Sequence, residues 1–291
     1  MLKPAIILAV TAVYCVQAET RFFLYTRNNP TVPEEITDES SVASSSFFDR
    51  DINTIILIHG HRGSARTPFN TLITDSILRF QEPHNVIVVD WEKDASYSYS
   101  TASARVPFVA RDLDFFLIWL AAHQSIPISK LHVVGFGLGA HIAGIASRWY
   151  VGHFGYRHTD GVGRITGLDP SGSGWGTNSQ RLRNTDASYV EVIHTDGSGL
   201  LANGIGTAIG DVNFYVNGGS NQPGCLTHSC SHNRAYEIFA ASMYNHNLVG
   251  FPCSSTTQLN LNRCTGSALN IGGTELYKRG SSRVYRINTR N

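Results

Sequence analysis

The sequence predicts an α/β fold, in which helices flank a mostly parallel sheet within a single domain. Short runs of β-branched and other apolar residues alternate with longer segments of helical periodicity, a pattern typical of βαβ units. One of these runs leads through a glycine-rich turn into a helix of small residues, over 131–150. The chain has 291 residues, of which 42% are hydrophobic, so one large domain can bury an adequate core.

The first 18 residues are predicted to form a cleaved signal peptide. Lys3 precedes an apolar run over 4–16, and the segment ends in the small residue Ala18. This run is too short to span a bilayer, and no transmembrane segment is expected here or later in the chain. Residues 19–291 would then form the folded domain. Loss of Lys3 leaves equal numbers of acidic and basic side chains, which argues against nucleic acid as a partner.

Cysteine usage favours an extracellular protein. Cleavage of the signal peptide removes Cys15 and leaves Cys225, Cys230, Cys253 and Cys264. Four cysteines in a secreted chain predict two disulfides. Pairing of neighbours, Cys225 with Cys230 and Cys253 with Cys264, would close two short loops and is preferred, but the other two pairings stay open.

The first half of the chain predicts the following elements. A strand over 21–26 precedes a polar, Ser-rich excursion. Continuous β-branched runs over 54–58 and 85–90 are typical of strands buried on both faces. Apolar residues at three- and four-residue steps indicate helices over 68–80 and 101–123.

The second half continues this alternation. We expect strands over 131–134, 164–168, 189–195 and 212–215, and helices over 138–150 and 231–243. Glycine-rich loops separate them, and the chain beyond 250 is irregular or strand-like. Strands that are separated by helices of this length pair in parallel, so a parallel sheet is expected.

The turn Gly135-Phe136-Gly137-Leu138-Gly139 has the strand–turn–helix context of a nucleophile elbow, whose pattern is G-x-S-x-G. The outer glycines permit the tight turn and close packing of helix on strand. The central position, where the pattern has serine, is Gly137. The backbone N–H of Leu138 is expected to donate into an oxyanion hole.

Chain order predicts the partners of this elbow. Asp169 follows the strand over 164–168, and His232 lies downstream, which is the order elbow, acid, base of α/β-hydrolases. The loop His59-Gly60-His61 leaves a buried strand upstream and would supply a second oxyanion N–H, that of His61. An ordinary strand-to-loop junction explains this loop equally well when it is taken alone.

Seven segments resemble the pancreatic lipase family and follow its order. They are His59-Gly60, Val89-Asp90-Trp91, 134–141, 165–170, 192–197, 214–219 and Pro223-Gly224-Cys225. The resemblance covers about 21–264 and implies an α/β-hydrolase fold and an esterase ancestry without a cofactor. It matches Asp169 to the triad aspartate and His232 to the triad histidine, while Gly137 occupies the position of the serine.

The chain also departs from that family. Phe136 stands where the family usually has histidine, and His61 where it has a bulky apolar residue. The lid between two cysteines is reduced to 226–229, which is similar to phospholipase A1 members. The C-terminal β-sandwich domain of many members is not expected within these 291 residues.

The glycine decides the predicted activity. Glycine has no side-chain oxygen to form an acyl-enzyme. Ser147 lies ten residues along the following helix, Ser171 and Ser173 belong to a different loop, and none of them is expected to replace it. We therefore expect an inactive, secreted pseudo-lipase that binds or carries lipid or another apolar ligand, as the yolk proteins of this family suggest by analogy. One alternative is an active carboxylic ester hydrolase, a triacylglycerol lipase or phospholipase A1, in which His232 activates a water molecule over Gly137. Another is a structural or nutritive protein with an empty pocket.

No metal site is expected. His59 and His61 are two residues apart, and His228 and His232 are four apart. Zinc normally needs three or four ligands, and neither pair has the further ligands. His194 is interpreted as a core histidine.

Overall fold

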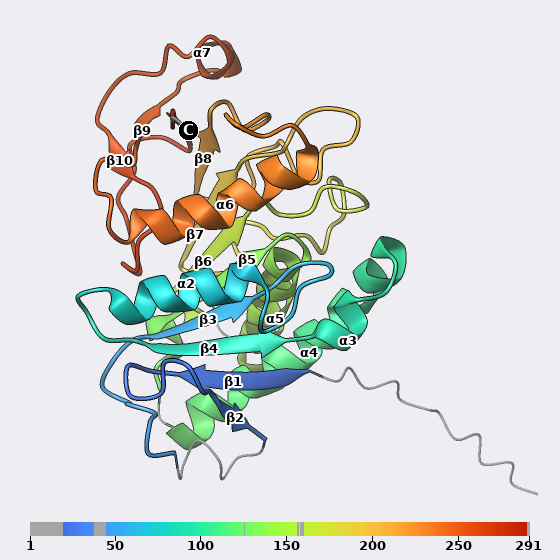
Figure 1. The fold of residues 1–291 in the computed structure, drawn as a ribbon, viewed down its shortest axis with the longest axis vertical. Coiled ribbons are helices and arrows are strands. Elements are labelled where there is room, and N and C mark those ends of the chain that lie inside the picture. The colour runs from blue at the N-terminus through green and yellow to red at the C-terminus, as the bar shows by residue number, and fades with distance from the viewer. Residues whose placement is uncertain (1–19, 38–44, 125, 156, 158–159, 290–291) are drawn as a thin grey trace, which may run out of the picture.

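A computed structural model of the protein describes residues 20–37, 45–124, 126–155, 157 and 160–289 (Figure 1). The predicted signal peptide lies outside these residues. The strands are β1 (Arg21–Tyr25), β2 (Glu34–Ile36), β3 (Thr54–Ile58), β4 (Asn85–Asp90), β5 (Leu131–Phe136), β6 (Arg164–Leu168), β7 (Tyr189–His194), β8 (Val212–Val216), β9 (Val249–Pro252), β10 (Leu269–Asn270) and β11 (Val284–Ile287). The helices are α2 (Pro68–Arg79), α3 (Glu92–Ala95), α4 (Tyr99–Gln124), α5 (Leu138–Phe154), α6 (His228–Ser242), α7 (Thr256–Asn260) and the short 3₁₀ helix η1 (Ile128–Lys130).

The strands form one sheet in the order β10-β9-β11-β8-β7-β6-β5-β3-β4-β1-β2. Every pairing from β4 across to β11 is parallel. Antiparallel strands lie only at the two edges of this sheet. The predicted α/β fold with a mostly parallel sheet is confirmed.

Helices cover both faces of the sheet (Figure 1). Ile56 and Ile58 of β3 belong to a core shared with α4 and α5. Ile55 and Leu57 belong to a core on the other face, shared with α2 and α6. Both faces of the strand are therefore buried, which explains its unbroken run of β-branched and leucine side chains. Among the described residues, no helix combines the length and apolar composition that crossing a bilayer requires.

The turn between β5 and α5 is unusually close to the neighbouring backbone. A Cβ atom added at Gly139 would lie 2.2 Å from the carbonyl oxygen of Ile58, and one at Gly135 would lie 2.4 Å from that of Gly139. Neither contact is sterically possible, so glycine at both positions lets the start of α5 pack directly on β3 and β5.

Several boundaries differ from those predicted. β2 was not predicted, because its three residues form a strand only by pairing with β1, where Arg21 also bonds Glu35. Helix α6 begins at His228 instead of at 231, since the side chain of Thr227 caps it by accepting the N–H of Cys230. The two disulfides join Cys225 to Cys230 and Cys253 to Cys264.

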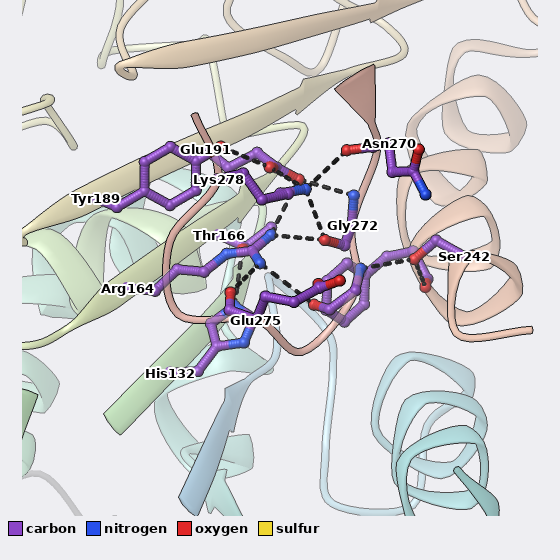
Figure 2. A network of polar contacts seen from close by, with 12 residues as sticks. His132, Arg164, Thr166, Tyr189, Glu191, Ser242, Asn270, Gly272, Glu275 and Lys278 are labelled. Atoms are coloured by element: carbon purple, nitrogen blue, oxygen red, sulfur yellow. Dashed lines mark hydrogen bonds and ion pairs between the residues drawn. The ribbon is translucent and has the colours of Figure 1, made fainter. Parts of the chain in front are cut away.

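A buried ionic network joins the C-terminal segment to the amino ends of β6 and β7 (Figure 2). The carboxylate of Glu191 lies 3.0 Å from Arg164 and 2.5 Å from Lys278, and it also accepts the hydroxyl of Tyr189 and the N–H of Gly272. Burial raises the pKa of Glu191, but the charges of Arg164 and Lys278 outweigh this effect and hold it below its usual value. This network fixes the chain around Gly272 against the sheet, at the end opposite to the elbow.

Candidate active site

The elbow is centred on Gly137, between β5 and α5. Its backbone has φ 56° and ψ −116°, a conformation that residues with side chains adopt only under strain. Its N–H donates to the carbonyl of Leu168 (3.1 Å), and its own carbonyl accepts the N–H of Ser171 (3.2 Å). The turn therefore keeps the geometry of a nucleophile elbow, and glycine adopts this geometry without a steric penalty.

Asp169 and His232 form a hydrogen-bonded pair beside the elbow. Nδ1–H of His232 donates to Oδ2 of Asp169 over 2.6 Å. The other carboxylate oxygen accepts the backbone N–H groups of Thr195 (2.8 Å) and Asp196 (3.0 Å). Asp169 is fully buried and has a positive φ of 40°, directly after β6. The carboxylate is thus held by three donors and orients the imidazole.

The imidazole faces Gly137. A Cβ atom built on Gly137 would lie 3.2 Å from Nε2 of His232. On its other side the ring packs against Phe136, at a centroid distance of 4.4 Å. The structure thus brings together Gly137, Asp169 and His232, which the sequence places in three distant segments.

Ser171 is the residue whose position the sequence did not predict. Its Oγ lies 3.4 Å from the same Cβ point on Gly137, although it belongs to the loop after β6. Its carbonyl accepts Nε2–H of His141 over 2.9 Å. Burial lowers the pKa of His141 to about 4, so this imidazole is neutral at pH 7. Within the described residues, Ser171 and His232 share no direct hydrogen bond.

Proximity to Asp169 was the available signal for Ser171. Only Pro170 separates the two residues, so the turn that carries the acid also carries this serine to the elbow. Ser147 lies elsewhere: its hydroxyl is buried and bonds the carbonyl of Asp186.

The loop after β3 lies against the end of β5. Trp91 fixes this loop, because its indole N–H donates to the carbonyl of His59 (2.8 Å) and its backbone N–H donates to Nε2 of His59 (3.1 Å). The ring of His61 bonds the carbonyl of Tyr97 (2.8 Å). Among the described residues, no acceptor bonds the backbone N–H of His61 or of Leu138.

A cavity of about 720 Å³ opens over this arrangement. Phe69, Phe136 and Tyr236 form an aromatic wall, with ring centroids 5.3–6.2 Å apart. Leu200 and Leu201 also line it, and both are largely exposed to solvent. The basic lining residues are Arg62, His59, His61 and His232, and no described Asp or Glu lines the cavity. Its volume suits one small organic ligand, for which pockets span about 300–1,000 Å³.

The other histidines have structural partners. His228 bonds Asp196 over 2.6 Å, and His194 bonds the carbonyl of Ile205 and the side chain of Asn213 inside the core. The described residues contain no group of three or more His, Cys, Asp and Glu side chains that could hold a metal ion.

A parallel sheet, a strand–turn–helix elbow and an adjoining Asp–His pair together define an α/β-hydrolase. The chain belongs to the Lipase family, whose sequence profile matches residues 9–276. It is 35% identical over 261 residues to lipase member H-A of Xenopus laevis, which covers 85% of this chain and 54% of that protein. It is 32% identical over 270 residues to pancreatic triacylglycerol lipase of Homo sapiens, covering 84% of this chain and 56% of that one. The chain thus spans about half the length of the curated relatives that it matches. The resemblance to pancreatic lipases is confirmed.

Proposed function

We propose that this protein is a lipase-fold protein without a nucleophile, which binds lipid or another apolar ligand instead of hydrolysing it. One observation carries the proposal: the residue that faces Nε2 of His232 at the elbow is Gly137. A Cβ atom built on this glycine would lie 3.2 Å from Nε2. Ester hydrolysis by this machinery requires a hydroxyl at that point, whose proton passes to the imidazole.

In this proposal the protein retains the other parts of a catalytic site and lacks only the nucleophile. Asp169 is the remnant acid and His232 the remnant base, while the N–H groups of His61 and Leu138 are the oxyanion donors. Loss of the serine from a comparable triad lowers kcat by about 10⁶ and leaves roughly 10³–10⁴ over the uncatalysed rate. Ester turnover at the rate of an intact lipase is therefore not expected.

The cavity supports the binding function. Three aromatic rings and two leucines provide apolar surface beside the elbow, and the leucines, Leu200 and Leu201, are 100% and 74% exposed. Exposed leucines around a pocket mouth are typical of sites that meet apolar ligands or lipid. Disulfides persist in oxidising compartments, so the two in this chain, together with the predicted signal peptide, support secretion.

The alternative, an active carboxylic ester hydrolase, has one observation in its favour. The space between Nε2 of His232 and Oγ of Ser171 is polar, and a water molecule there could be deprotonated by the imidazole. Such a route lacks a covalent intermediate and predicts slow turnover that a serine-directed reagent does not inhibit.

Labelling and turnover distinguish these functions. The secreted protein and its Gly137→Ser variant are treated with a fluorescent phosphonate that labels activated serines, and both are assayed on a short-chain ester. We expect no labelling of the unaltered protein and labelling of the variant at residue 137. His232→Ala in the variant background is the control, since it removes the base. Rapid turnover or labelling of the unaltered protein would refute the proposal, and extraction followed by mass spectrometry tests for bound lipid.

A further inference from the structure

We propose that the cavity selects a long-chain carboxylic acid and that its carboxylate lies over Gly137, in the space that a nucleophile side chain would fill. This inference rests on the proposed function and names the class of ligand. The tail of the acid would lie along the aromatic wall formed by Phe69, Phe136 and Tyr236.

The surroundings of Gly137 match one oxygen of a carboxylate. The atoms nearest to its Cβ point are Nε2 of His232 (3.2 Å) and Oγ of Ser171 (3.4 Å), and the third is Cε1 of the same imidazole (3.7 Å). An oxygen held just above the glycine therefore meets two hydrogen-bonding atoms first. Serine at this position would place its own Cβ and Oγ there and exclude the ligand oxygen.

The second carboxylate oxygen has separate donors. The N–H of Leu138 is the first of helix α5, and the N–H of His61 belongs to the loop that packs on the end of β5. N–H groups at the start of a helix have no acceptor within it and favour anions. A carboxylate has two acceptor oxygens and no donor, so it can use the amides with one oxygen and the side chains with the other.

The Asp169–His232 pair favours an acid over a neutral lipid. Asp169 accepts Nδ1–H of the imidazole over 2.6 Å, which leaves Nε2 facing the space over Gly137. A carboxylic acid that transfers its proton to Nε2 becomes a carboxylate, and the Nε2–H then donates a charge-assisted hydrogen bond to it. An ester or an alcohol offers only neutral acceptors to the same groups, and neutral bonds are weaker.

The charges around the cavity agree with an anionic head group. Its basic lining residues are Arg62 and three histidines, and no described carboxylate lines it. Asp169 is buried behind His232 and is already bonded by three donors. A cationic head group would therefore find no free carboxylate here.

Titration calorimetry with matched ligands tests the assignment. The full chain is titrated with dodecanoate, methyl dodecanoate, dodecanol and dodecyl phosphate, each below its micelle concentration. We expect dodecanoate to bind at least about tenfold more tightly than the ester and the alcohol, as a charge-assisted bond in place of a neutral one predicts. Tighter binding of the phosphate would assign the site to phosphorylated lipids and overturn the carboxylate assignment.

Variants locate the head group. Gly137→Ala fills the space with a methyl group without creating a nucleophile, and Ser171→Ala removes one donor with little change in volume. We expect each to reduce the preference for acid over alcohol by at least about fivefold. His232→Gln removes the imidazole that faces the head group. His228→Gln is its matched control, because His228 lies on the same helix but bonds Asp196. Circular dichroism verifies that each variant is folded.

The outcomes separate the two proposals. If none of the four ligands binds, the proposed binding function fails. If acid, ester and alcohol bind equally, that function stands and the carboxylate assignment is wrong. If Gly137→Ala and Ser171→Ala both retain the full preference for the acid, its head group lies elsewhere and the assignment is likewise overturned.

Discussion

His232 lies 2.6 Å from Asp169 through Nδ1, while its other ring nitrogen faces a glycine. In a working triad the carboxylate orients the imidazole toward a hydroxyl. Here the same contact satisfies a buried carboxylate, which also bonds the N–H groups of Thr195 and Asp196. The pair therefore has a structural reason to persist whether or not the protein is catalytic.

Asp169→Ala should destabilise the protein. The change leaves the N–H groups of Thr195 and Asp196 and Nδ1–H of His232 without their acceptor in a buried site. Because each unsatisfied buried donor costs about 1–3 kcal/mol, we expect the free energy of unfolding to fall by more than about 2 kcal/mol in urea denaturation.

Asp75→Ala is the control for this change. Asp75 forms an exposed ion pair with Arg79, and such pairs contribute less than about 1 kcal/mol. Equal effects of the two substitutions would contradict a structural role for the Asp169 carboxylate.

Gly137→Ala should lower stability for a different reason. Alanine at φ 56° and ψ −116° is strained, and its Cβ would approach Nε2 of His232 to 3.2 Å, so we expect a loss of about 1–3 kcal/mol. Gly155→Ala is the matched comparison, since Gly155 has φ 64° but no atom within 4 Å of the added Cβ. A smaller cost at Gly137 than at Gly155 would show that the elbow backbone relaxes easily.

Glu191→Gln should be among the most damaging single changes. It removes the carboxylate that forms ion pairs with both Arg164 and Lys278 in the network of Figure 2, and it leaves these two buried cations without that partner. Breaking a buried ion pair in this way costs about 3–5 kcal/mol, measurable by thermal or urea unfolding. Glu237→Gln, in a partly exposed pair with Arg234, provides the comparison, and a similar small loss at both sites would refute the prediction.

His141 should make stability depend on pH. Its folded-state pKa of about 4 is below the value of about 6.5 expected in the unfolded chain, so the unfolded state binds more protons between these two values. The contribution is present in full above pH 6.5 and declines as pH falls toward 4, by up to about 3 kcal/mol. Urea denaturation at pH 7.5 and pH 5 should show a smaller decline in His141→Gln than in the unaltered protein. An equal decline in both would place the pH dependence on other groups.

The sequence predicted most elements because their signals are local. The β-branched runs of β3 and β4 match the observed strands residue for residue, and the glycine turn correctly predicted the start of α5 at Leu138. It did not predict β2, whose residues have weak strand propensity and form a strand only on β1. Helix α6 also began earlier than predicted, because its cap at Thr227 depends on the geometry of a disulfide loop.

The sequence alone determined that residue 137 has no nucleophile, since an absent hydroxyl is a property of the residue in any fold. It also determined the order of Gly137, Asp169 and His232 along the chain. Only the tertiary structure decided what surrounds the glycine. The carboxyl ends of parallel strands meet at one edge of the sheet, and this brings Ser171 to 3.4 Å from a Cβ point on a residue 34 positions earlier in the chain. Contacts of that kind depend on packing between distant segments, so no local pattern records them.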